Sequence, residues 1–181
     1  MKALRVLIVE DEAIVAMDIE ERLANLGYEP VGHAISGPEA IDLAERLRPD
    51  VVLMDIHLRG EMDGISAARE LHRTLCAPVI FLTAFSEDET LKQASLVEPY
   101  GYIIKPFKDS DLKSTIEIAH YKYAADREIL RLNGLLDLLG QVTQAIIHGV
   151  SREELFADVC RFAVERGSIA TACICLLDPA R

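Results

Sequence analysis

Acidic, hydroxyl and amine side chains follow four short apolar segments of this chain. Glu10 and Asp11 come after LRVLIV, Asp55 ends VVLMD, Thr83 ends PVIFLT, and Lys105 follows GYII. Apolar runs of this length are typical of parallel strands that are buried on both faces. Because open α/β sheets bind ligands at the carboxyl ends of their strands, we expect these side chains to share one edge.

The elements that must position these residues alternate along the first two thirds of the chain. Apolar strands and amphipathic helices follow one another five times, which predicts a doubly wound five-stranded parallel sheet. Ser36-x-x-Glu39 and Ser86-x-x-Glu89 each predict a helix start with a capping box. The strands are predicted at Leu4–Glu10, Pro30–Ile35, Asp50–Asp55, Pro78–Thr83 and Gly101–Ile104.

Beyond Asp109 the pattern becomes helical and continues to about Ile147. Apolar residues recur there at heptad spacing, although Gly134 and Gly140 could each mark a break. A capping box at Ser151 and an apolar strand at the end of the chain follow. We therefore expect a first domain at 1–125, a helical connector at 126–150 and a partial α+β segment at 151–181. The heptad positions are Leu132, Leu135, Leu139, Val142 and Ile146.

Composition narrows the classes of partner. The 181 residues are 50% hydrophobic and carry a formal net charge of -11, so nucleic acid and anionic membranes are poor direct partners. The sequence starts without the pattern of a signal peptide, and its longest apolar run is too short for a membrane-spanning helix. We expect a cytoplasmic protein without a membrane partner.

Five segments, taken together, resemble a known family. LIVEDE, VVLMDIHL, MDGISAA, PVIFLTAF and GYIIKPF occur in the order and spacing of the receiver domain of two-component response regulators. The resemblance covers residues 1–125. It implies a flavodoxin-like sheet with strand order 2-1-3-4-5, an order taken here from the family. It also implies a phosphoacceptor, not an enzyme, whose partner is a sensor histidine kinase or a histidine phosphotransfer protein.

The resemblance assigns the acids to a metal-dependent phosphoryl transfer. Asp55 would be the phosphoacceptor; Asp11, Asp55 and the backbone carbonyl of His57 would bind Mg²⁺, with Glu10 acting through water. The physics agrees, because carboxylates brought within about 4–6 Å repel by several kcal/mol unless a cation joins them. Oxygen ligands suit Mg²⁺. Glu12 follows so closely that the order of the acids is only inferred.

Other residues take the family's contact and switch roles. Lys105 and the Thr83 hydroxyl would contact the phosphoryl group, and Ala84 is small enough to leave that approach open. Tyr102 matches the switch aromatic that turns inward when Thr83 moves. Ordinary strand packing is the alternative for Tyr102. Lys105-Pro106 fits the family's bend, where the peptide bond can be cis.

The sequence departs from the commonest family pattern after Asp55. The usual proline is absent, and Gly64 falls nine residues after Asp55, one more than usual. We expect a longer loop in which Gly60 is a turn residue. The His57 imidazole either tunes the lifetime of the phosphorylated state or is incidental.

Two rival functions and several partners stay open. A haloacid-dehalogenase-like phosphatase would need a second Asp where His57 stands, and a phosphorylation-independent pseudo-receiver would lack one of the key residues. Residues 138–178 resemble the start of a GAF sensory domain, which would be the downstream module. A homodimer could form through helix four, strand five and helix five, or through the connector.

Overall fold

The computed structural model describes residues 3–74, 77–84, 99–147, 156–157, 159–161, 164 and 173. The chain divides into two compact units, Met1–Tyr123 and Ala124–Arg181. Within the described residues, no helix is both long enough and apolar enough to cross a membrane. The predicted capping boxes at Ser86 and Ser151 and helix four lie outside these residues, as does the predicted terminal strand apart from residue 173.

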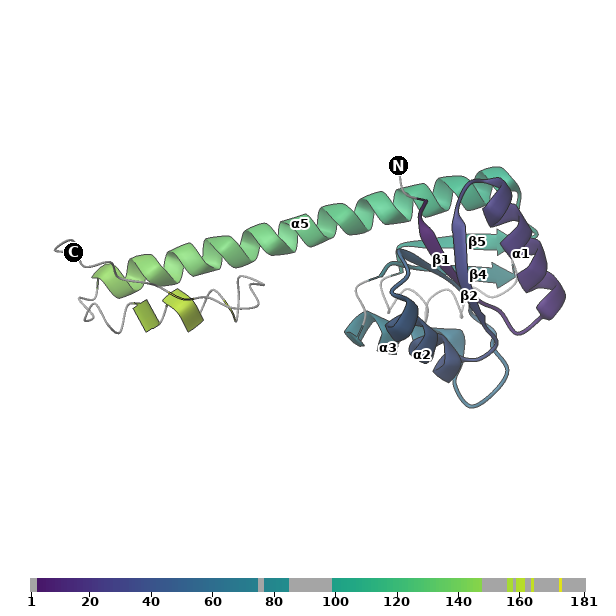
Figure 1. Ribbon diagram of the computed structural model, residues 1–181, viewed down its shortest axis with the longest axis horizontal. Helices are drawn as coiled ribbons and strands as arrows, with labels where there is room; N and C mark the ends of the chain where they lie inside the picture. The colour runs from purple at the N-terminus through teal and green to yellow at the C-terminus, as the bar shows by residue number, and fades with distance from the viewer. Residues whose placement is uncertain are drawn as a thin grey trace, which may run out of the picture. The chain divides into compact units, whose positions relative to one another are not determined.

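The first unit contains one parallel five-stranded sheet in the order β2-β1-β3-β4-β5 (Figure 1). Each strand lies within one residue of its predicted bounds, so the doubly wound flavodoxin-like fold is confirmed. The strands are β1 (Arg5–Val9), β2 (Glu29–Ala34), β3 (Val51–Asp55), β4 (Val79–Ala84) and β5 (Gly101–Lys105). The described helices are α1 (Ala13–Asn25), α2 (Gly37–Leu47), α3 (Gly64–Thr74) and α5 (Asp109–Ile147).

Helices cover both faces of this sheet because alternate strand residues point to opposite sides. Leu7 and Val9 of β1 pack with α2 and α3, whereas Val6 and Ile8 pack with α1 and the first turns of α5. All five residues of β3 are buried. The two apolar layers hold the strands rigidly, which fixes the positions of the side chains at their carboxyl ends.

Local sequence explains where the helices begin and end. Gly27 follows α1 with φ +87°, a conformation that glycine adopts at little cost. Ser36 is the N-cap of α2, as predicted, but its hydroxyl makes no capping hydrogen bond. The predicted capping box is therefore wrong in detail: the Glu39 carboxylate accepts a hydrogen bond from the N–H of Ile35, one residue earlier.

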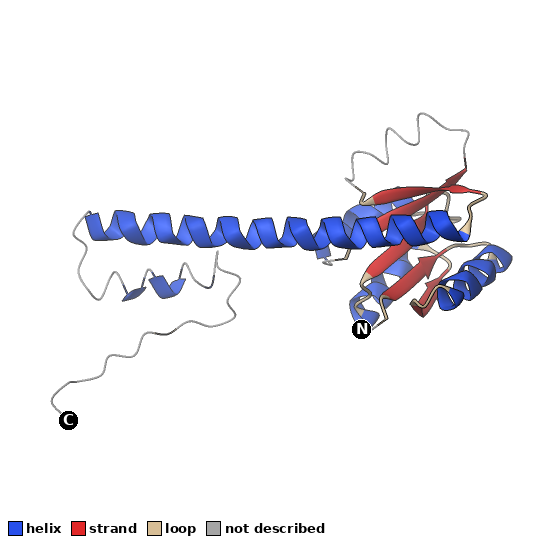
Figure 2. Cartoon of the chain, turned by 90° about the horizontal axis from the view of Figure 1, so that it is seen from above, coloured by secondary structure: helices blue, strands red, loops and turns tan. Residues whose placement is uncertain are grey.

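The helix α5 runs from Asp109 to Ile147 without a break at either glycine (Figure 2). Its end agrees with the prediction, and three of the five predicted heptad positions can be compared, because the side chains of Val142 and Ile146 lie outside the described residues. Leu132 and Leu139 are exposed as a heptad seam requires, whereas Leu135 is half-buried and Leu136 is 65% exposed. The exposed stripe therefore runs through 132, 136 and 139. Residues three and four positions apart lie on the same face of a helix, so spacing alone allows either Leu135 or Leu136 on this stripe.

Candidate functional site

Three carboxylates meet at the carboxyl edge of the sheet. Glu10 and Asp11 follow β1, Asp55 ends β3, and one carboxylate oxygen of each lies within 4.8 Å of the others. Glu10 is fully buried and Asp55 is 8% exposed. Glu12, by contrast, is exposed as the N-cap of α1, so Glu10 is the acid that joins the cluster.

Lys105, at the end of β5, bridges two of these acids. Its Nζ lies 2.6 Å from Glu10 Oε2 and 2.6 Å from Asp55 Oδ2. The ammonium group donates a charge-assisted hydrogen bond to each carboxylate, which offsets part of their mutual repulsion. The predicted convergence of residues from β1, β3 and β5 is therefore present in the structure.

Burial and charge shift the pKa values of this cluster. Burial raises the pKa of the Glu10 carboxyl, and the neighbouring Asp55 charge adds to the rise while the Lys105 hydrogen bond opposes it. Burial alone would lower the pKa of Lys105, but hydrogen bonds to Asp55 and Glu10 outweigh that effect and raise it. Lys105 is therefore held in its charged form.

The loop after β3 holds the Asp55 side chain and backbone in place. The backbone N–H of His57 donates a 2.9 Å hydrogen bond to Asp55 Oδ1. Gly64 packs so closely that an added Cβ would lie 1.9 Å from the Asp55 carbonyl oxygen, which explains the glycine there. Gly60 has φ +124°, as the predicted turn requires, and Asp63 caps α3 through the N–H of Ser66.

The predicted switch residues lie on two neighbouring strands, Thr83 on β4 and Tyr102 on β5. The Thr83 side chain is buried, and its hydroxyl donates to the carbonyl of Ala84 at 3.1 Å. Tyr102 is half-buried and packs against Phe81, with ring centroids 6.0 Å apart. Its hydroxyl is buried without a hydrogen-bond partner among the described residues, and burial raises the phenol pKa. The Lys105-Pro106 bond is cis.

Two residues near the acids were missed by the sequence reasoning. Arg59 reaches Asp11, with Nε 2.9 Å from Oδ2. His33 of β2 lies with Nε2 2.7 Å from the backbone carbonyl of Glu10. Arg59 stands where many relatives of the resembled family have a proline, and that departure was the signal that could have identified it.

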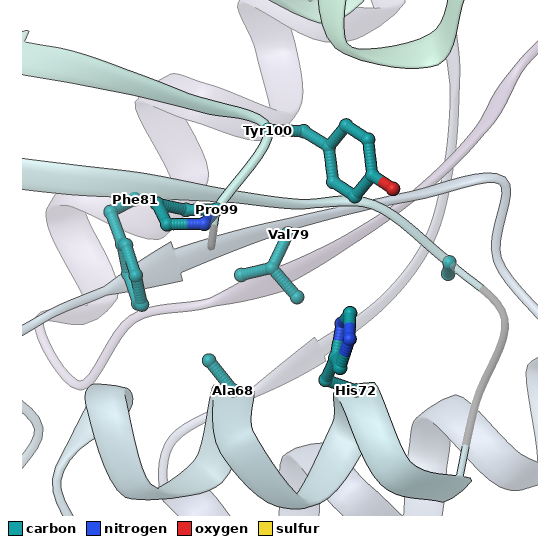
Figure 3. A pocket seen from close by; sticks show the side chains of 7 residues that line it. Ala68, His72, Val79, Phe81, Pro99 and Tyr100 are labelled. Atoms are coloured by element: carbon teal, nitrogen blue, oxygen red, sulfur yellow. The ribbon is translucent and has the colours of Figure 1, made fainter. Parts of the chain in front are cut away.

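The described part of the first unit has several surface hollows. A groove of about 570 Å³ borders Lys105 and is lined by α1 residues such as Ile14 and by Phe107. A much smaller cavity, with a volume of about 10 Å³, is lined by His72 of α3 and Tyr100, which Figure 3 shows with its neighbours. A cavity of that size holds one water molecule at most, so it is not a ligand site.

The acid cluster fits a hard divalent cation. Its donors are carboxylate oxygens, which suit Mg²⁺, and the three groups lie close enough to share one ion. Their net charge also favours a cation, because among the described residues two basic side chains, Lys105 and Arg59, form ion pairs with the three carboxylates. An acidic triad of this kind is typical of the magnesium site of receiver domains.

Comparison with known proteins identifies the family. The family described as the response regulator receiver domain matches residues 6–117. The chain belongs to this family. Receiver domains are phosphoacceptors and not enzymes in the usual sense, and the acidic pocket with Lys105 is consistent with that role. A receiver also implies a cognate histidine kinase.

Individual relatives extend the comparison. The receiver chain is 38% identical over 174 residues to the transcriptional regulatory protein PdtaR of Mycobacterium tuberculosis, covering 90% of this chain and 83% of that protein. It is also 36% identical over 107 residues to the chemotaxis protein CheY of Thermotoga maritima, covering 59% of this chain and 88% of CheY.

Solved structures give the same result. The receiver domain of a modulated diguanylate cyclase from Desulfovibrio desulfuricans G20 matches with 38% identity and a TM-score of 0.66, covering 69% of this chain and 99% of that one. The N-terminal domain of a response regulator/sensory box/GGDEF protein from Carboxydothermus hydrogenoformans matches with 34% identity and a TM-score of 0.62, covering 67% and 98%. None of these comparisons supports the GAF-like interpretation of residues 151–181.

Proposed function

We propose that this receiver accepts a phosphoryl group on Asp55 from the phosphohistidine of a histidine kinase or phosphotransfer protein. An oxygen of the Asp55 carboxylate attacks phosphorus, and the P–N bond of the donor breaks as the imidazole leaves. The observation that carries the proposal is the position of Asp55: its carboxylate lies at the strand edge, hydrogen-bonded by Lys105 Nζ and by the N–H of His57.

A magnesium ion is the cofactor of this proposal. Asp11, Asp55 and the backbone carbonyl of His57 are its expected ligands, with Glu10 acting through water. Bound there, the ion would neutralise charge that otherwise repels an incoming phosphoryl group. The proximity of the three carboxylates supports this assignment.

We assign the remaining residues by their places around Asp55. Lys105 is already charged and close to Asp55, so it would pair with a phosphoryl oxygen. Thr83 ends its hydrogen bond to Ala84 and turns its hydroxyl to another phosphoryl oxygen. Ala84 leaves space for that movement. Tyr102 then changes its packing against Phe81, and this movement breaks no hydrogen bond between its hydroxyl and the described residues.

The groove beside Lys105 is the expected docking place for the phosphoryl donor. It combines an apolar wall with access to the acid cluster, and Ile14 on its rim is 85% exposed. A donor helix packed there could present a phosphohistidine to Asp55. The relatives whose names state an output differ from one another, so the receiver itself does not define what the signal controls. A cytoplasmic location and a GAF-like module downstream remain hypotheses.

Dimerisation through the connector is the second part of this proposal. Ile129, Leu132, Leu136 and Leu139 are all exposed on α5, and their 3-4-3 spacing is that of a coiled-coil seam. We propose a second copy of the chain as the partner of this stripe. The alternative surface formed with helix four lies outside the described residues.

The rival functions predict different chemistry. A phosphatase would turn over a phosphoester, whereas a receiver keeps one phosphoryl group. The decisive experiment incubates the chain with acetyl phosphate and Mg²⁺ and measures the intact mass. One added phosphoryl group is expected, Asp55→Asn should abolish it, and Asp42→Asn on the surface of α2 should not. A pseudo-receiver would take up none, and labelling that persists in Asp55→Asn would refute the assignment.

A further inference from the structure

We propose that Arg59 is a tethered counter-ion of the acid pocket, which lowers the affinity of the unphosphorylated receiver for its divalent cation. The inference rests on the proposed magnesium site and adds a positioning residue outside the family's usual set. Its starting point is the 2.9 Å contact between Arg59 Nε and Asp11 Oδ2.

The loop holds the Arg59 backbone within reach of Asp11. Arg59 stands between Leu58, which is 8% exposed, and Gly60, whose φ of +124° turns the chain. On the other side of the turn, Met62 packs against Gly37 at the start of α2. The loop is therefore anchored on both sides of Arg59, and its backbone is held where the side chain can reach Asp11.

The two basic side chains divide the three acids between them. Lys105 bonds Glu10 and Asp55, and Arg59 pairs with Asp11. The Asp11 side chain is only 11% exposed, whereas that of Arg59 is 85% exposed. Asp11 thus offers a fixed, partly desolvated charge, and Arg59 supplies a charge that can leave toward solvent at low cost.

A divalent cation and the guanidinium group compete for Asp11. Both are attracted to the same carboxylate, and they repel each other if both remain. A phosphoryl group on Asp55 adds negative charge to the pocket, and the guanidinium group of Arg59 then stabilises that charge. Arg59 would therefore make metal binding weaker before phosphorylation than after it.

The test is calorimetric titration of the full chain with Mg²⁺ alone, in the absence of any phosphoryl donor. Removing the charge in Arg59→Gln should tighten Mg²⁺ binding by roughly 3- to 10-fold at low salt, with a smaller gain at high salt, from the Coulomb energy of charges about 5 Å apart. Arg59→Lys should retain affinity close to that of the wild type.

Arg46→Gln is the matched control, because Arg46 also pairs with an aspartate, Asp42, on an exposed surface. It makes the same change in net charge far from the acids in the fold, so it should leave the Mg²⁺ affinity unchanged. Equal or weaker binding in Arg59→Gln, or the same gain in Arg46→Gln, would overturn the role of Arg59 alone. Absence of Mg²⁺ binding in every variant would remove the metal site and both proposals with it.

Discussion

Lys105 Nζ lies 2.6 Å from Asp55 Oδ2 although 50 positions separate the two residues in the sequence. The contact joins the ends of β3 and β5, which are not neighbours in the sheet, since β4 lies between them. The lysine therefore reaches over the end of β4 to the acceptor. Its chain length and its charge are both needed for that contact.

Replacing Lys105 with methionine should destabilise the metal-free receiver. Glu10, which is fully buried, and Asp55 would lose their shared cation. We expect the free energy of unfolding to fall by about 2 kcal/mol. Breaking a buried ion pair costs roughly 3–5 kcal/mol, and the loss is smaller here because 25% of the Lys105 side chain is exposed. Urea unfolding followed by circular dichroism measures it. Mg²⁺ should restore part of the loss, and Lys108→Met, an exposed neighbour, should cost little.

Removing the metal should stop labelling. In excess chelator, acetyl phosphate should add no phosphoryl group, because the carboxylates would repel the donor. Asp11→Asn should raise the Mg²⁺ concentration for half-maximal labelling at least about tenfold, since one carboxylate ligand is lost. Asp42→Asn should leave that concentration unchanged. Intact mass against Mg²⁺ concentration is the measurement, and undiminished labelling in chelator would exclude the metal from the reaction.

Gly64→Ala should damage the site without touching any of its reactive groups. The new Cβ would lie 1.9 Å from the carbonyl oxygen of Asp55, and the nearest atoms are backbone of Asp55 and Ile56, not the end of a flexible side chain. The loop must shift, so labelling of Asp55 should slow at least about tenfold and stability should fall by about 1–3 kcal/mol, as in other overpacked sites. Gly140→Ala is the control, because open space surrounds that position in α5. Wild-type labelling in Gly64→Ala would contradict the close packing.

The stripe on α5 predicts which leucine controls assembly. Leu136 and Leu130 are 65% and 68% exposed, but only Leu136 lies in the 129–132–136–139 register. Leu136→Asp and Leu139→Asp should halve the molar mass measured by light scattering, because each places a charge in the seam. Leu130→Asp should not. If all three variants keep the wild-type mass, the stripe packs within one chain instead.

The sequence was sufficient for the sheet and for most of the acid cluster. Four of the five strands are short apolar runs followed by polar residues, and parallel topology then brings Glu10, Asp55 and Lys105 together whatever their separation. Helix surfaces were harder, because spacing alone does not choose between the adjacent leucines Leu135 and Leu136 of α5. Arg59 was missed for another reason: an exposed arginine in a loop has no periodicity, and only the folded loop shows that it reaches Asp11.

The phosphoacceptor and the residues that respond to it lie on strands that differ in burial. Asp55 ends a central strand in which every residue is buried, whereas Tyr102 and Lys105 belong to β5, an edge strand with only one buried position. Amide hydrogens of β3 should accordingly exchange with solvent only on global unfolding, and those of β5 through smaller openings. The phosphoryl group would be attached to the rigid strand β3, and the conformational response to it would occur in the more easily opened strand β5.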